Sequence, residues 1–309
     1  MRLFRGLPDS AQRVPSVLTI GKFDGVHRGH QALLSRVCEI AGLMGAAATV
    51  LTFEPHPRDF FAQRQHGDTL RARWAVPRVA NLHDTLEALA EAGIGRVVVH
   101  PFDAHFAAIR AEQFIHEILV QGLAVRSILV GHDFCFGAGR KGDLAMLIRA
   151  GKLHGFEVHA IDPIMQGSVR ISSSGVREAL AHADFPLARE LLGRSYAVSG
   201  RLAPLDTCDA RYGFPELEFI GLERSALPAG IYSVYLHTQA ALAVAATIRV
   251  KHDVKAGASG RPRVCLTALT RESWPAHLST RERVRVEFVS LLNKETALLP
   301  QHLRAGVVA

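Results

Sequence analysis

Cysteine and two of the aromatic residues are scarce in this chain, which has four cysteines, two tryptophans and four tyrosines among its 309 residues. The cysteines form no C-x-x-C pair, so we expect reduced thiols rather than disulfides or metal ligands at Cys38, Cys135, Cys208 and Cys265. No apolar run approaches the roughly 20 residues that span a bilayer, and the N-terminus shows no signal-peptide core. We therefore expect a cytoplasmic protein without a membrane segment.

Charge of either sign is also limited, because charged residues make up 21% of the chain and hydrophobic residues 48%. This balance is typical of a globular protein, and the length suits one large domain or two ordinary ones. The formal net charge of +7 suits phosphorylated small molecules as partners. The sequence has no basic patch interleaved with aromatic residues, so we expect no nucleic-acid partner. It does not indicate an oligomeric state.

The segment from Val17 to Ala41 joins an apolar run typical of a buried strand to an amphipathic helical pattern. The turn between them holds Gly21, Asp24, Gly25, His27, Gly29 and His30. A strand that runs through such a turn into a helix directs backbone N–H groups and the positive end of the helix dipole at one spot, where phosphates bind. Two imidazoles there can donate hydrogen bonds to phosphate oxygens. A helix cap or polar surface is the alternative interpretation of the two histidines. A zinc site is disfavoured, because no nearby cysteine or acidic residue completes its set of ligands.

Strand-like and helical patterns alternate along residues 17–161, which predicts a parallel sheet covered by helices on both faces. The expected strands are 17–20, 46–53, 96–100, 127–131 and 157–161, and the expected helices include 82–92, 114–119 and 143–150. Residues 1–16 are expected to be an irregular lead-in and residues 62–78 a basic loop. Because ligands of open α/β sheets bind at the carboxyl ends of strands, His56 is placed beside the first phosphate site.

A dinucleotide-binding fingerprint is a rival interpretation. Gly137, Gly139 and Gly142 fit G-x-G-x-x-G, and Asp162 lies 20 residues beyond. Such a fingerprint belongs to the first strand–helix unit of a Rossmann domain, however, and here it comes late. Bulky Arg140 and Lys141 also lie inside the turn, which argues against this interpretation.

A second anion site is predicted near residue 172. Ser172, Ser173 and Ser174 are good N-cap residues for a following helix, and Arg170 and Arg177 flank its start. Arginine can bind phosphate with two parallel hydrogen bonds, which supports an anion site here. Together with the first site, it gives two phosphate sites in one α/β domain, as a triphosphate would need. A well-capped helix with surface arginines is the alternative.

Four motifs resemble, in order and spacing, those of the prokaryotic FAD synthetases, the bifunctional riboflavin kinase/FMN adenylyltransferase family. They are G-K-F-D-G-V-H-R-G-H, F-E-P-H-P, V-G-H-D-F-C-F-G-A-G-R-K-G-D and R-I-S-S-S-G-V-R. The resemblance covers roughly residues 15–200. It implies an N-terminal Rossmann-like nucleotidyltransferase domain of the H-x-G-H superfamily, which transfers AMP from ATP to FMN and yields FAD and pyrophosphate with Mg²⁺.

The resemblance also implies site residues. Those with catalytic roles would be His27, His30, Arg170, Ser173, Ser174 and Arg177. Those that bind nucleotide or flavin would be Gly21, Phe23, Asp24, Gly25, His56, Asp133 and Phe134, while the metal ligands stay unassigned.

Residues 186–309 are expected to form a second, smaller domain after residues 1–185. Short apolar runs alternate with turns there, which predicts a small β-barrel. This part resembles the riboflavin kinase domain weakly. The kinase motif G-F-P-T-A-N is kept only in its first half, at residues 213–215. Its T-A-N half is replaced by Glu216, Leu217 and Glu218.

Two further kinase positions also depart from the family. The glycine–arginine pair of its phosphate loop falls on Asp209 and Ala210, and its catalytic glutamate aligns approximately with Arg263. An arginine cannot accept a proton at neutral pH. We therefore predict an FMN adenylyltransferase whose kinase activity is lost or severely reduced. The alternatives are the fully bifunctional enzyme, a transferase acting on another phosphate acceptor, and a non-catalytic flavin- or nucleotide-binding protein.

Overall fold

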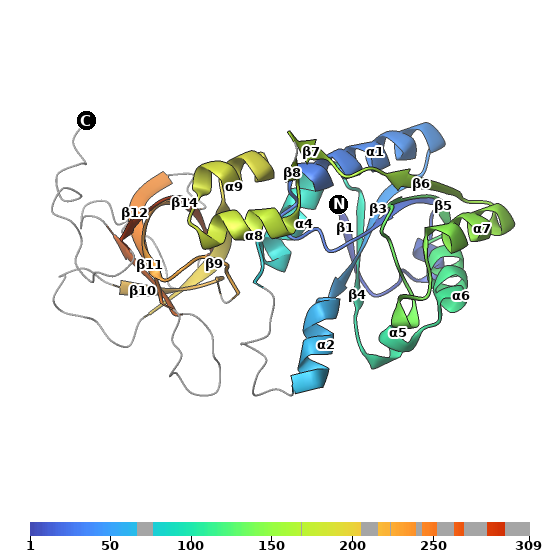
Figure 1. Ribbon diagram of the computed structural model, residues 1–309, viewed down its shortest axis with the longest axis horizontal. Coiled ribbons are helices and arrows are strands. Elements are labelled where there is room, and N and C mark those ends of the chain that lie inside the picture. The colour runs from blue at the N-terminus through green and yellow to red at the C-terminus, as the bar shows by residue number, and fades with distance from the viewer. Residues whose placement is uncertain are drawn as a thin grey trace. The chain divides into compact units, whose positions relative to one another are not determined.

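The computed structural model describes residues 1–66, 77–167, 169–204, 216–222, 224–238, 243–251, 263–268 and 283–293. The chain divides into two units, each with its own sheet (Figure 1). The first unit contains Met1–Trp74 and Thr85–Ile171, and the second contains Ala75–Asp84 and Ser172–Ala309. Among the helices of the described residues, none has the length and apolar character needed to cross a membrane.

The first unit is built on a six-stranded parallel sheet, which confirms the predicted fold class. Its strands are β1 (Arg2–Arg5), β2 (Ser16–Ile20), β3 (Ala47–Glu54), β4 (Arg96–Pro101), β5 (Val125–Gly131) and β6 (Glu157–Ile161). They lie in the order β1-β4-β3-β2-β5-β6. The chain winds outward from β2 in both directions, through β3 on one side and β5 on the other. Ligands of open α/β sheets bind at the carboxyl ends of strands beside such a switch point.

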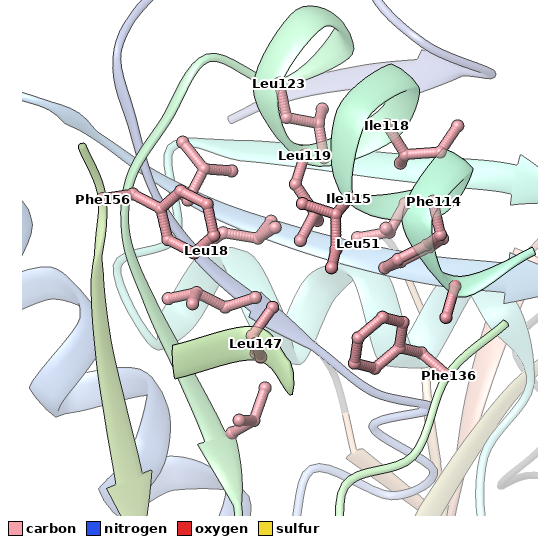
Figure 2. Packing of buried hydrophobic residues seen from close by; sticks show 14 of the residues in the cluster. Leu18, Leu51, Phe114, Ile115, Ile118, Leu119, Leu123, Phe136, Leu147 and Phe156 are labelled. Atoms are coloured by element: carbon pink, nitrogen blue, oxygen red, sulfur yellow. The ribbon is translucent and has the colours of Figure 1, made fainter. Parts of the chain in front are cut away.

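Helices cover both faces of this sheet. On one face α1 (Arg28–Met44) packs against β2 and β3, and Cys38 of α1 donates a hydrogen bond to Ala92, just past α4 (Leu82–Glu91). The other face carries the core cluster, in which Ile115 and Leu119 pack toward Leu18 of the sheet (Figure 2). The elements on or near that face are α5 (Ala104–Ala108), α6 (Ala111–Gln113), the π-helical η3 (Phe114–Gly122) and α7 (Leu144–His154).

Two segments of the first unit differ from the sequence prediction. The expected irregular lead-in contains β1, which extends the sheet by pairing in parallel with β4, and the short η1 (Ser10–Gln12). The expected basic loop at 62–78 begins inside helix α2 (Pro57–His66), and its residues 67–76 lie outside the described residues. After β6, the strands β7 (Met165–Gln166) and β8 (Val169–Arg170) form a hairpin, and η4 (Ala138–Arg140) lies within the loop after β5.

The second unit contains the predicted barrel, which is closed and antiparallel in the order β10-β13-β12-β11-β14-β9. Its strands are β9 (Ala197–Pro204), β10 (Glu216–Ile220), β11 (Gly230–His237), β12 (Ala243–Lys251), β13 (Arg263–Ala268) and β14 (Arg283–Asn293). Helices α8 (Ser173–Ala181) and α9 (Phe185–Leu192) precede them and pack together. The ring of Phe185 lies 6.0 Å from that of Tyr232 and 5.9 Å from that of Phe288, which anchors α9 to the barrel.

The units divide at residue 171, whereas the sequence expectation divides the chain between residues 185 and 186. The anchoring of α9 by Phe185 and the packing of α8 on α9 explain why both helices belong with the barrel. Residues 75–84 also join this unit. Asn81 donates to the carbonyl of Ser199 (2.8 Å), and the buried carboxylate of Asp84 accepts from the Ser199 N–H (3.0 Å).

Candidate active site

The turn after β2 ends at His27, which caps helix α1. Its Nδ1 atom accepts a hydrogen bond from the backbone N–H of His30 (3.2 Å), so one of the unpaired amides of the first helical turn is satisfied. Because Nδ1 is the acceptor, the neutral His27 ring carries its proton on Nε2. The cap therefore fixes one tautomer, in which Nε2 is a hydrogen-bond donor.

The two imidazoles of the H-x-G-H sequence are stacked. Their ring centroids lie 3.7 Å apart and their planes differ by 15°. His27 is 5% exposed, and the Nδ1 atom of His30 is fully buried without a hydrogen-bond partner among the described residues. Burial, and to a smaller degree repulsion from His27, hold the pKa of His30 well below its usual value of 6.5. At neutral pH His30 is therefore an uncharged ring in the positive field of a helix N-terminus.

The backbone of this turn is strained. Phe23 has φ 49° and Val26 φ 39°, both in the left-handed region, where a residue other than glycine costs of order 1–3 kcal/mol. Gly25, at φ 80°, adopts a conformation that suits glycine. Two hydrogen bonds retain the shape: the Val26 N–H donates to Phe23 (3.0 Å), and Gln31 Nε2 donates to Val26 (2.8 Å). Such strain is typical of functional turns that a rigid surrounding structure holds in place.

Arg170 and Asp133 lie in the same unit and form an ion pair of 3.8 Å between side chains that are both exposed. The next residue, Ile171, passes close to the start of α1, because a Cβ atom at Gly29 would lie 3.3 Å from its carbonyl oxygen. Gly29 thus permits the chain that carries Arg170 to approach the histidine pair. The structure brings these predicted residues to one end of the sheet.

The other predicted residues are distributed as follows. Phe23 is 1% exposed, so its ring contacts His30 rather than the surface. His56 accepts from the N–H of Arg58 (3.0 Å) at the start of α2. In the second unit, the Ser172 hydroxyl is the N-cap of α8 and accepts from Gly175 (3.2 Å). Gly21, Asp24 and Gly25 belong to the turn after β2, Phe134 to the loop after β5, and Ser173, Ser174 and Arg177 to the first turns of α8.

The glycines of the dinucleotide-like fingerprint have structural explanations. A Cβ atom at Gly142 would lie 2.6 Å from the ring of Phe136, and one at Gly137 would lie 2.7 Å from the backbone of Ala111. Phe136 and Gly142 also pair through two backbone hydrogen bonds of 3.0 and 2.9 Å. Gly137 and Gly142 therefore allow close packing of a tight loop, Gly139 has a positive φ of 63°, and no dinucleotide is needed to account for the three glycines.

A row of phenylalanine rings lies at the carboxyl edge of the sheet, and the sequence did not predict it. Neighbouring ring centroids lie 5.3 to 6.2 Å apart. We call the set the phenylalanine row; its members are Phe53, Phe60, Phe61, Phe102, Phe106, Phe114, Phe134 and Phe136. It runs from α2 past the ends of β3 and β4 to the loop after β5. Because its members come from β3, α2, the loop after β4, α5, η3 and the loop after β5, only the folded chain reveals it.

Among the described residues, no group of three histidine, cysteine or acidic side chains is arranged to hold a metal ion. Mg²⁺ commonly keeps several waters and binds through one or two carboxylates together with substrate phosphates. Exposed Asp133 is a carboxylate of the required chemistry at the edge of the sheet where the histidines lie. A single carboxylate of this kind fits a magnesium ion that brings most of its ligands with a nucleotide.

A parallel sheet with a capped H-x-G-H helix at its switch point, followed by a barrel, defines the chain as an α/β nucleotidyltransferase with an added barrel unit. The sequence profile described as FAD synthetase matches residues 9–175. The chain belongs to the FAD synthetase family.

Three relatives support this assignment, each named a bifunctional riboflavin kinase/FMN adenylyltransferase. The protein from Escherichia coli K12 is 40% identical over 76% of this chain and 72% of its own length. Those from Pseudomonas fluorescens and Haemophilus influenzae are 39% and 38% identical over 76% of this chain, and over 72% and 73% of their own lengths. A solved structure of a macrolide-efflux protein from Streptococcus pneumoniae shares the fold, with a TM-score of 0.75, 19% identity and coverage of 98% of this chain and 96% of that one.

Proposed function

We propose that the protein is an FMN adenylyltransferase, which transfers AMP from ATP to FMN and releases pyrophosphate. The observation that carries the proposal is the stacked histidine pair at the N-terminus of α1, in which His27 is buried and His30 is partly buried. Family membership supports the same reaction, since the curated relatives are named for it. The test is to incubate purified protein with FMN and ATP and to measure FAD and pyrophosphate, which we expect to form in equal amounts. Formation of neither product would refute the proposal.

In the proposed reaction an oxygen of the FMN phosphate attacks the α-phosphorus of ATP. A new P–O bond forms, the bond between the α-phosphorus and the bridging oxygen breaks, and pyrophosphate leaves with the bonding electrons. The attacking oxygen is already an anion, so no general base is required. Catalysis then depends on alignment and on stabilising the growing charge. His27 and His30 would donate hydrogen bonds from Nε2 to the phosphates, with the helix N-terminus behind them.

Other residues have proposed supporting roles. Arg170 would bind a phosphate once it leaves its ion pair with Asp133, and Asp133 and His56 would orient substrate or a magnesium ion that enters with ATP. The magnesium ion would neutralise phosphate charge. For Ser173, Ser174 and Arg177 we keep the proposal of an anion site at the start of α8. The cytosol stays the proposed location.

The outer end of the phenylalanine row, at Phe61, offers a surface for the isoalloxazine ring of the acceptor. The row lies at the same edge of the sheet as the histidine pair, and Phe61 at its outer end is 46% exposed. A flat aromatic ring gains about 0.5–1.5 kcal/mol from an aromatic neighbour beyond the area it buries. This surface favours a flavin phosphate over a small polar phosphate as the acceptor.

Phe61→Ala should therefore raise the KM for FMN by about tenfold, because one stacking partner is lost, and should leave the KM for ATP within about twofold. Steady-state kinetics with each substrate varied in turn gives both constants. Leu153→Ala is the control, since Leu153 is an exposed apolar residue of α7 (79%) away from the row. Equal changes in the two KM values would remove Phe61 from the flavin site.

We further propose that riboflavin kinase activity is lost. The proposal rests on the sequence, because residues 209–215 lie outside the described residues and the side chains of Glu216, Glu218 and Arg263 in β10 and β13 are not described. An arginine in place of the family's glutamate could not take the proton of a flavin hydroxyl. The fully bifunctional enzyme is the second candidate, because the relatives are named as such.

Incubation with riboflavin, ATP and Mg²⁺ distinguishes these candidates. We expect no FMN or FAD above the background without protein, although FMN in a parallel reaction becomes FAD. Steady formation of FMN or FAD from riboflavin would show that the barrel is a working kinase.

A further inference from the structure

Phe23 lies under the histidine pair without reaching the surface. Its ring is 1% exposed, and its centroid lies 5.0 Å from that of His30, at an angle of 53° between the planes. His27 stacks on another part of His30, with centroids 3.7 Å apart. The His30 imidazole therefore contacts both a phenyl ring and a second imidazole. No hydrogen bond among the described residues holds its buried Nδ1 atom.

The Phe23 ring is fixed from below as well. A Cβ atom at Gly21 would lie 3.1 Å from Cε2 and 3.2 Å from Cζ of Phe23, so the ring rests directly on the backbone at the end of β2. The residue is also held in the left-handed region, at φ 49°, and its carbonyl accepts from Val26. A bulky residue at positive φ is uncommon and persists only where the surroundings determine it. Here the result is a rigid support beneath one imidazole.

We propose that Phe23 is a positioning residue, whose ring holds the His30 imidazole in the orientation that phosphate transfer requires. This inference rests on the proposed adenylyltransferase function. The buried Nδ1 atom of His30 has no hydrogen-bond partner among the described residues, unlike that of the usual catalytic histidine, so ring packing contributes to the orientation of this imidazole. A misplacement of about 1 Å in a reacting group can cost about 100-fold in rate. The buried Phe23 ring also shields the part of the His30 ring that it contacts from water.

Two variants test this role from opposite directions in the full-length protein. Phe23→Leu keeps an apolar side chain but removes the flat ring, so kcat for FAD formation should fall about tenfold or more while both KM values change less than about twofold. Gly21→Ala keeps the ring but displaces it by a few tenths of an ångström, because the added Cβ is too close to Cε2 and Cζ. It should lower kcat by a smaller factor, also without a large change in KM.

A second measurement does not depend on turnover. In Phe23→Leu without substrates, NMR titration of the His30 ring protons should give a pKa closer to 6.5 than in the unmodified protein, because water reaches the ring. Among the described residues, His27 is the titratable group whose charge acts on His30, and it is unchanged in the variant. Phe156→Leu is the control: Phe156 is 5% exposed in the core of the same unit, so its loss should lower stability without altering kcat or the pKa of His30.

The inference is overturned if folded Phe23→Leu has an unchanged kcat, or if the pKa of His30 is the same in the variant and the unmodified protein. It is also overturned if Phe156→Leu reproduces both effects, because Phe23 would then act only on stability. If the unmodified protein forms no FAD, the proposed function fails separately, and the NMR titration still decides whether Phe23 controls the environment of His30.

Discussion

His30→Ala should lower kcat/KM for FAD formation by about 100- to 1000-fold. The loss of one preorganised donor to a developing negative charge typically costs about 3–4 kcal/mol of transition-state stabilisation. His30 is an uncharged, largely dehydrated ring beside the helix N-terminus, where a hydrogen bond to phosphate is stronger than it is in water. Steady-state rates of FAD formation by the variant and the unmodified protein give the ratio.

Two controls define what a loss of activity in His30→Ala would mean. His154→Ala changes an exposed histidine of α7 and should leave kcat/KM unaltered. Stability against pH gives an independent readout, since His30 has a lowered pKa in the folded protein and an ordinary one after unfolding. Below pH 6.5, unfolding therefore takes up a proton at His30. On acidification the unmodified protein should lose stability for this reason, and His30→Ala should not show this loss. Near-normal FAD formation by the variant would remove His30 from the mechanism.

His27→Ala should lower activity as strongly as His30→Ala and should also destabilise the protein. The substitution removes the N-cap of α1, because Nδ1 of His27 accepts from the His30 N–H, and loss of such a cap costs about 1 kcal/mol. It also removes the proposed Nε2 donor, and this separate effect should lower kcat/KM by about 100-fold. Urea unfolding measures the first effect, and FAD formation measures the second.

His27→Asn separates the two roles of this residue. Asparagine is among the best N-cap residues, so this variant should recover most of the stability that His27→Ala loses. The shorter amide cannot place a donor where Nε2 lies, and activity should stay low. If His27→Asn recovered activity together with stability, His27 would be a cap and not a ligand of phosphate.

Local patterns predicted most of the first unit. The strand–turn–helix from β2 to α1 and the apolar runs of β3 to β6 combine a clear period with recognisable caps, and the structure places each of them close to the predicted bounds. Ser172 was also correctly placed as an N-cap candidate, since its hydroxyl caps α8. These features follow from residues that are neighbours in sequence, and a pattern can report them.

What the sequence could not show depends on residues far apart in the chain. Strand β1 is short and largely exposed, so its four residues have no apolar pattern, and only pairing with β4 makes them a strand. The contact of Phe23 with His30 depends on a backbone at positive φ that no rule assigns to phenylalanine. Likewise, the phenylalanine row joins rings from α2 to the loop after β5, which tertiary packing alone brings together.

The measurement that tests the central claim most directly follows the phosphorus atoms of ATP. Purified protein is incubated with FMN and with ATP carrying radioactive phosphorus at either the α or the γ position. If the histidine pair holds the nucleotide for attack at the α-phosphorus, the α label appears in FAD and the γ label leaves in pyrophosphate. The account would be contradicted if the γ label appeared in a flavin, or if neither label appeared in FAD or pyrophosphate.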